Sequence, residues 1–177
     1  MTGARWFFAL WPDPAAREAL AAARAELIPP GARPTHPLDL HLTLRFLGEL
    51  DDTGLASAEA AAERVASGAV AVLLDRLGHF ARSRVLWAGP SRPDSSLLAL
   101  ADQLEASLRA AGLPPETRPF RPHVTLARKV NRGPGPGSPW PATIGWQATT
   151  FALAAGQPGA TPRYARRRQW PLGQTSG

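Results

Sequence analysis

Histidine and threonine recur together at two places in this chain, in the segments His41–Leu44 and His123–Leu126, which both read His-apolar-Thr-apolar. In an extended strand successive side chains point to opposite faces, so the histidine and threonine of each segment share one face. A face of this kind is costly to bury without partners, which favours contact with solvent or a ligand. We therefore expect the two strands to present these side chains to one common site.

Two imidazoles can divide acid and base catalysis, because at a pH of about 6.5 one ring can accept a proton while the other donates one. His41 and His123 could thus displace an oxygen at a phosphate ester without a cysteine or serine nucleophile. The hydroxyls of Thr43 and Thr125 could donate hydrogen bonds to phosphate oxygens, and an arginine could stabilise the charge of the transition state. A lone histidine is more often structural, but the repeat in matching strands favours the functional interpretation.

The predicted elements that must position these motifs indicate an α+β fold. Aspartate caps and apolar periodicity predict helices over residues 14–28, 51–66 and 94–112, and the apolar stripe of the last helix is predicted as Leu97, Leu98, Leu104 and Leu108. Strands are predicted at residues 5–10, 41–46, 70–75, 77–80, 84–88, from 123 onward, at 146–154 and at 163–170. Residues 77–80 and 84–88 should pair as a hairpin, and the Gly- and Pro-rich residues 131–141 should form an exposed loop.

Length and composition favour one intracellular body. The 177 residues suit a single domain over 1–177, and the near-symmetric placement of the motifs suggests two similar lobes within it. The chain has no cysteine, which excludes disulfides and thiolate nucleophiles and fits a reducing cytoplasm. The apolar stretch Trp6–Trp11 is too short for a signal segment, and no run approaches the roughly 20 apolar residues of a membrane helix. We expect a cytoplasmic monomer without a membrane partner.

Positive charge is concentrated in the second half of the chain. The formal net charge is +6, and no carboxylate follows Glu116, whereas nine arginines and lysines do. A polyanionic partner is therefore plausible, and Arg166–Arg168 with the six tryptophans could form an RNA track, in which Arg166 and Arg168 would share one face of a regular strand. The alternative is a compositional bias, which would explain arginine in place of lysine but not the missing acids. We expect most of the tryptophans to be core residues.

The ordered motifs resemble those of the two-histidine phosphoesterase superfamily, and within it the bacterial and archaeal RNA 2′,3′-cyclic phosphodiesterases, also called 2′-5′ RNA ligases. The resemblance covers nearly the whole chain. It rests on RWFFAL at 5–10, RP at 33–34, LHLTL at 40–44, FLG at 46–48, GHF at 78–80, RVLW at 84–87, FRPHVTLAR at 120–128 and Tyr164 in the last strand.

This resemblance implies two pseudo-symmetric lobes, each an antiparallel sheet with helices on its outer face, around a central cleft. It implies a metal-independent RNA 2′,3′-cyclic 3′-phosphodiesterase that uses no cofactor. His123 would take the proton of water and His41 would protonate the leaving 3′ oxygen, which leaves a 2′-phosphate. The substrate would be an RNA or nucleotide that carries a 2′,3′-cyclic phosphate.

By the same resemblance, Arg128 would bind phosphate and Phe46 would lie against the base or form a wall of the cleft. Strict strand alternation places Arg45 and Ala127, rather than Arg128, on the histidine face. Arg128 can therefore reach a phosphate only if its strand ends, twists or bulges.

Three alternatives remain open from the sequence: a 2′-5′ RNA ligase, an RNA-binding module on the same fold, and hydrolysis of a small cyclic nucleotide. Ligation would require a site for a second RNA end, and the sequence shows none. His36 precedes Pro37 in a Pro-rich loop and is expected to be a solvated loop residue, whereas His79 is expected to be structural because it has no repeat partner. A zinc site built from the four histidines lacks close ligand spacing and neighbouring carboxylates.

Overall fold

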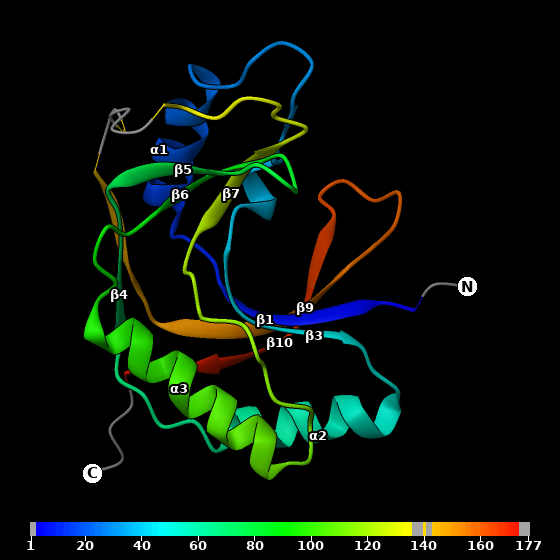
Figure 1. Cartoon of the computed structure of the whole chain (residues 1–177). Helices are drawn as coiled ribbons and strands as arrows, with labels where there is room; N and C mark the ends of the chain where they lie inside the picture. Colours follow the sequence, from blue (N-terminus) through cyan, green and yellow to red (C-terminus); the bar gives the residue numbers. More distant parts are fainter. Residues whose placement is uncertain (1–2, 136–139, 141–142, 174–177) are drawn as a thin grey trace.

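The computed structural model describes residues 3–135, 140 and 143–173 and has the predicted α+β architecture (Figure 1). Its elements in chain order are β1 (Arg5–Leu10), α1 (Pro14–Ala25), β2 (Arg33–Pro34), the 3₁₀ turn η1 (Pro37–Asp39), β3 (Leu42–Glu49), α2 (Asp52–Glu63), β4 (Val70–Leu74), β5 (Arg76–Phe80), β6 (Val85–Gly89), α3 (Ser95–Ala110), β7 (Val124–Arg128), β8 (Ile144–Ala148), β9 (Thr150–Gly156) and β10 (Tyr164–Pro171).

The three predicted helices are confirmed, and each begins after an aspartate. The side chains of Asp13, Asp51 and Asp94 each accept a main-chain N–H from the first turn of the helix that follows, which satisfies a donor without an intrahelical partner. The predicted stripe of α3 is wrong at one position. Leu98 is 41% exposed, and Leu100 is buried in its place because the spacing 97, 100, 104, 108 follows one helical face.

An antiparallel sheet connects the two lobes. Its strands run in the order β10-β9-β1-β3-β7-β6-β5, with β2 beside β7, and β4 and β8 form a separate pair. In Figure 1, α2 and α3 lie with β1, β3, β9 and β10, whereas α1 lies toward the other end with β5, β6 and β7. Among the described residues, β3 and β7 are paired at one position, Leu42 opposite Val124. The two motif strands therefore meet where the two lobes join.

The segment predicted as one strand over residues 146–154 forms two strands, β8 and β9. Residues 146–154 were expected to be continuous, but β8 pairs with β4 whereas β9 pairs with β1 and β10. The chain changes sheets at Thr149, whose carbonyl accepts the main-chain N–H of Leu172. Apolar residues run through both strands, so alternation does not reveal the break. The predicted hairpin is confirmed as β5 and β6. In the predicted loop, residues 131–135 form neither helix nor strand, while residues 136–139 and 141 lie outside the described residues.

Gly78 makes room for a large aromatic side chain on the neighbouring strand. It lies opposite Trp87 in the β5–β6 hairpin, and a Cβ placed on Gly78 would lie 2.0 Å from the indole Cζ2. No side chain larger than hydrogen fits there unless Trp87 moves. Trp87 in turn packs against His123, with ring centroids 6.1 Å apart.

We predict that Gly78→Ala lowers the melting temperature by about 2–10 °C, since overpacking a filled site typically costs about 1–3 kcal/mol. Gly68→Ala is the control, because a Cβ at Gly68 meets nothing within 4 Å. Thermal unfolding monitored by circular dichroism measures both variants. Equal melting temperatures for the two variants would contradict the close packing of β5 on Trp87.

Candidate active site

Both motifs are centred on the bridge between β3 and β7. Leu42 and Val124 are fully buried, so the residues on either side of each point to the opposite face of the sheet. We call the face that carries His41, Thr43, His123 and Thr125 the motif face, and the face that carries Leu42 and Val124 the helix face. Because the pairing is antiparallel, His41 and Thr125 lie on one side of the bridge and Thr43 and His123 on the other. The structure thus brings the four predicted motif residues together.

The two imidazoles are held by equivalent hydrogen bonds. His41 Nδ1 donates to the carbonyl of Asp39 at 2.6 Å, and His123 Nδ1 donates to the carbonyl of Arg121 at 2.7 Å. A carbonyl can only accept, so Nδ1 carries the proton and the neutral ring has its electron pair on Nε2. In both motifs Nε2 is therefore the atom free for proton transfer.

The imidazole of His41 packs among three aromatic rings of the first lobe. It stacks on Phe7 and Trp11 with centroids 5.0 and 5.2 Å apart, and it meets Tyr164 edge to face at 5.0 Å. Phe7 comes from β1 and Tyr164 from β10, so the sheet of this lobe positions the ring. These contacts restrict the ring plane of His41.

The imidazole of His123 packs in a similar way in the second lobe. It meets Phe80 of β5 edge to face at 5.1 Å and lies 6.1 Å from the ring of Trp87 on β6. Each histidine thus has aromatic walls on the side of its own lobe.

Burial is the main influence on both imidazoles. It lowers the pKa of His41 to about 4, against a smaller rise from the carbonyl and carboxylate of Asp39, while the charges of His123 and Arg128 lower it further. Burial also lowers the pKa of His123, the hydrogen bond to Arg121 raises it, and Arg128 lowers it. Both rings are therefore neutral at pH 7 in the unliganded protein. An anion beside them would favour protonation.

A β-bulge turns Arg128 onto the motif face. Thr125 lies opposite Trp87, but Ala127 lies opposite the next residue, Leu86, so Leu126 is an extra residue in β7. The bulge reverses the alternation of side chains after Leu126, so Arg128 points to the motif face. This is one of the irregularities that the sequence analysis required for Arg128 to reach a phosphate. The placement of Ala127 on the histidine face was wrong for the same reason, because Ala127 joins buried Leu86 on the helix face.

An equivalent bulge occurs in β3. Its register with β1 skips Leu44, which is the fourth residue of its motif as Leu126 is of the other, and it skips Leu47 further along the strand. As a result Phe46 lies opposite Phe7 on the motif face and is 41% exposed. The two bulges place Phe46 and Arg128, each five residues after a motif histidine, on the face that carries both histidines.

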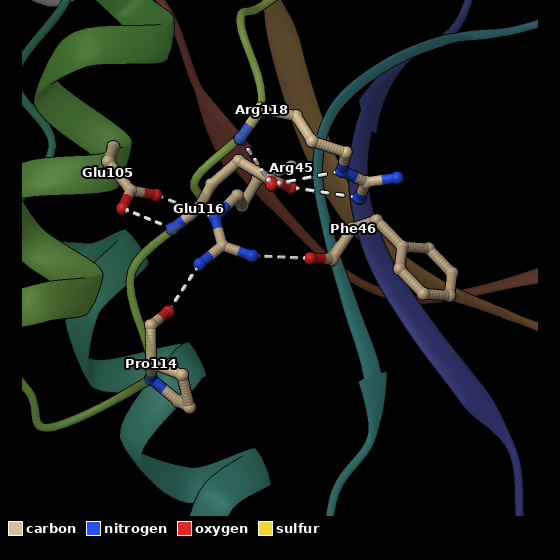
Figure 2. Close-up of polar contacts among 6 residues, drawn as sticks. All are labelled: Arg45, Phe46, Glu105, Pro114, Glu116 and Arg118. Atoms are coloured by element: carbon tan, nitrogen blue, oxygen red, sulfur yellow. Dashed lines mark hydrogen bonds and ion pairs between the residues drawn. The ribbon is translucent and has the colours of Figure 1, made fainter.

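The same bulge turns Arg45 away from the site, so the placement of Arg45 on the histidine face was wrong. Its guanidinium forms an ion pair with Glu105 of α3 at 2.6 Å and donates to the carbonyls of Phe46 and Pro114. Figure 2 shows this network, with the phenyl ring of Phe46 directed away from the guanidinium. Arg45 ties β3 to α3 and to the segment after that helix.

The C-terminal arginines are divided by a further bulge, in β10. The register between β10 and β9 skips Arg167, so Arg166 and Arg168 lie on opposite faces and the expectation that they act together is wrong. Arg166 lies on the motif face, with its guanidinium 5.2 Å from the ring centre of Trp11. Arg168 pairs with two glutamates of α2, at 2.5 and 3.6 Å.

One residue important for the site was missed by sequence reasoning. The Asp39 carboxylate is only 5% exposed and accepts the main-chain N–H groups of Arg163 and Tyr164, at 2.9 and 3.0 Å. Asp39 thus holds the start of β10 against the turn whose carbonyl orients His41. An aspartate between leucines carries no local signal for such a role, since its partners are more than 120 residues away.

The other two histidines make structural contacts. His36 accepts the N–H of Leu38 at 3.2 Å and caps η1, and His79 Nε2 donates to the carbonyl of Val130 at 2.7 Å. Within the described ranges, no cluster of three or more histidine, aspartate or glutamate side chains could hold a metal ion.

Two histidines that face one site from equivalent motif strands, on a two-lobed α+β fold, define a two-histidine phosphoesterase. The chain belongs to the 2′-5′ RNA ligase superfamily, whose family model matches residues 11–139. It is 35% identical over 176 residues to the RNA 2′,3′-cyclic phosphodiesterase of Escherichia coli, covering 96% of this chain and 97% of that protein. It is 32% identical over 162 residues to the protein of the same name in Thermus thermophilus, covering 84% and 80%.

Solved structures agree with these relatives. The apo form of E. coli LigT superposes with a TM-score of 0.85 at 32% identity, covering 97% of this chain and 98% of that one. The TT0787 protein of T. thermophilus gives a TM-score of 0.74 at 29% identity, covering 95% and 97%. None of the helices in the described part of the chain has the length and apolar composition needed to cross a membrane.

We predict that His41 titrates near pH 4 in the free protein and that the pKa of His123 also lies below the ordinary value of 6.5. Removing the positive charge in Arg128→Gln should raise both values, because a nearby cation disfavours the imidazolium. Proton NMR of the imidazole Cε1–H signals measures this, with the exposed Arg92→Gln as the charge-matched control. Unshifted titrations in Arg128→Gln would show that Arg128 is not beside the histidines.

Proposed function

We propose that this protein hydrolyses the 2′,3′-cyclic phosphate at an RNA end to a 2′-phosphomonoester by acid–base catalysis that needs no metal ion. The observation that carries the proposal is the pair of motif histidines beside one buried bridge, each with Nδ1 bound to a carbonyl and Nε2 free. The similarity to RNA 2′,3′-cyclic phosphodiesterases supports RNA as the substrate. The enzyme is proposed to act as a monomer in the cytoplasm.

The reaction is an in-line displacement at phosphorus. The oxygen of a water molecule forms a bond to phosphorus while His123 Nε2 takes one of its protons. The P–O3′ bond breaks on the opposite side, and His41 Nε2 gives its proton to O3′. His41 takes up the proton that it later donates when the anionic substrate binds, because a nearby anion favours the imidazolium. The carboxylate of Asp39 acts in the same direction, since its charge raises the pKa of His41. After the reaction His123 carries the additional proton and His41 is neutral.

The remaining motif-face residues bind the phosphate and the nucleoside. The hydroxyls of Thr43 and Thr125 donate to the non-bridging oxygens, and the guanidinium of Arg128 stabilises the charge of the transition state. Phe46 offers an exposed ring on the side of His41, where the ribose that carries O3′ must lie. Arg166 beside Trp11 extends this surface with a positive charge for the rest of the RNA.

Replacing either histidine by alanine should lower turnover of a 2′,3′-cyclic nucleotide by about 10²- to 10⁴-fold, as expected for the loss of a positioned acid or base. The double variant should be little slower than the slower single variant, because the two groups act on one transition state. Steady-state kinetics measures this, and His36→Ala, a histidine outside both motifs, serves as the control. Turnover near the wild-type rate in either single variant would reject the assignment.

The regiochemistry tests which histidine is the acid. If His123 activates water and His41 protonates O3′, only the P–O3′ bond breaks and the phosphate stays on O2′. Phosphorus NMR of the product from adenosine 2′,3′-cyclic phosphate should show the 2′-monophosphate alone. The 3′-monophosphate would mean that the acid and base roles, or the orientation of the substrate, are reversed.

A further inference from the structure

Two arginines lie directly opposite each other at the end of the second motif strand. The short strand β2 pairs antiparallel with β7, and Arg33 is the register partner of Arg128. Opposed residues of an antiparallel pair point to the same face of the sheet, with Cβ atoms about 4.5–5.5 Å apart. Since Arg128 is on the motif face, Arg33 is on the motif face as well. The reaction assigned above uses Arg128 and leaves Arg33 without a role.

The bulge in β7 fixes this pair of cations. The carbonyl of the extra residue, Leu126, accepts the main-chain N–H of Thr35 at 2.9 Å, so β2 is attached at the same bulge that turns Arg128. Both arginines are exposed, and among the residues that the structure describes neither forms an ion pair with a carboxylate. The two positive charges are therefore held side by side without a counterion from the protein.

Such an arrangement costs stability, because like charges directly opposite each other in a sheet repel. Elsewhere in the same sheet a strand arginine has a complementary neighbour, since Arg5 of β1 lies opposite Glu49 of β3. Guanidinium groups form charge-assisted hydrogen bonds with phosphate oxygens, so a bound phosphate would remove the repulsion between Arg33 and Arg128. The pair is thus suited to an anionic ligand.

The position of β2 indicates which phosphate Arg33 can reach. The charge of Arg128 lowers the pKa of both His41 and His123, which places this guanidinium at the reacting phosphate. Arg33 is on the neighbouring strand, one position beyond it.

The chain that follows Arg33 leads to the surface assigned above to the rest of the RNA. After β2 it enters η1, where the carbonyl of Leu38 accepts the indole N–H of Trp11 at 3.3 Å. The guanidinium of Arg166 lies 5.2 Å from the ring centre of the same tryptophan. The β2–η1 segment therefore connects the reacting phosphate at Arg128 with the basic surface at Arg166.

We propose that Arg33 binds the phosphodiester that joins the terminal nucleotide of the RNA to the preceding nucleotide. The inference rests on the proposed function, because it takes the cyclic phosphate to lie at the two histidines. Arg128 binds the reacting phosphate, and Arg33 binds the next phosphate of the chain. The enzyme thereby favours an RNA end over a single nucleoside cyclic phosphate, two substrate classes that the sequence left open.

The test compares two substrates that differ by this phosphodiester. Adenosine 2′,3′-cyclic phosphate lacks it, whereas the dinucleotide ApA with a 2′,3′-cyclic phosphate end carries it. In Arg33→Gln the KM for the dinucleotide should rise by about three- to tenfold with kcat unchanged, as expected for the loss of one exposed charged contact. The dependence of this KM on salt should fall by about one counterion. The kcat/KM for the mononucleotide should stay within about twofold of wild type.

Arg5→Gln is the matched control, because it removes the same charge from an exposed strand residue that faces a glutamate. It should leave the kinetics of both substrates unchanged. The two variants should also differ in thermal unfolding. Arg33→Gln should melt at or above the wild-type temperature because a repulsion is lost, whereas Arg5→Gln should melt slightly below it because an attraction is lost.

Three results would overturn the assignment of Arg33. Equal losses on both substrates would place it at the reacting phosphate, and unchanged dinucleotide kinetics and salt dependence would show that it binds no phosphate. A melting temperature of Arg33→Gln well below that of wild type would show that Arg33 stabilises the fold and is not part of a repulsive pair. Failure of the wild type to hydrolyse either substrate would instead reject the proposed function itself.

Discussion

Leu42 and Val124 face each other across the one described pair between β3 and β7, and both are completely buried. The relative position of the two histidines depends on this contact, because His41 immediately precedes Leu42 and His123 immediately precedes Val124. A single cross-strand pair contributes only about 0.2–1 kcal/mol, so the bridge cannot hold the lobes in place by itself. The apolar residues of the helix face, which pack beneath both strands in one continuous core, must fix it. The site is thus as rigid as the core below it.

Around this bridge the backbone is nearly symmetric, but the side chains are not. Both histidines donate Nδ1 to the carbonyl two residues before, and both strands bulge at the fourth motif residue. The symmetric bulges then deliver different groups to the motif face, an aromatic ring from Phe46 and a cation from Arg128. The carboxylate of Asp39 adds a charge on the side of His41. These differences allow two identical imidazoles to take different roles in one reaction.

Much of the fold could be predicted from the sequence because the signals are local. Aspartate caps mark the three helices, and the two His-apolar-Thr-apolar segments alternate as strands do. The bulges could not be predicted, since the residues that follow Leu44 and Leu126 mix apolar and charged side chains and do not show which residue is the extra one. Every error about which residues share a face of a strand has this origin: Arg45, Ala127 and the pairing of Arg166 with Arg168.

Contacts between distant segments were also beyond prediction. Asp39 meets β10, and the basic C-terminal strand finds its acidic partners on α2, residues that are separated by more than 100 positions. The concentration of positive charge was visible, but two of the three arginines of the apparent RNA track, Arg167 and Arg168, pair with glutamates of α2 and hold β10 on that helix. Only the part that the bulge leaves on the motif face, Arg166 beside Trp11, remains for a ligand.

The central claim is that both imidazoles act through Nε2 on one phosphate. A crystal structure of the protein with adenosine 2′-monophosphate, the expected product, tests it most directly. The mechanism predicts that Nε2 of His41 and Nε2 of His123 both lie within hydrogen-bond distance of the nucleotide, with phosphate oxygens also bound by Thr43 and Thr125. A phosphate bound by one histidine alone, or by Arg163 and Arg166 away from the bridge, would contradict it.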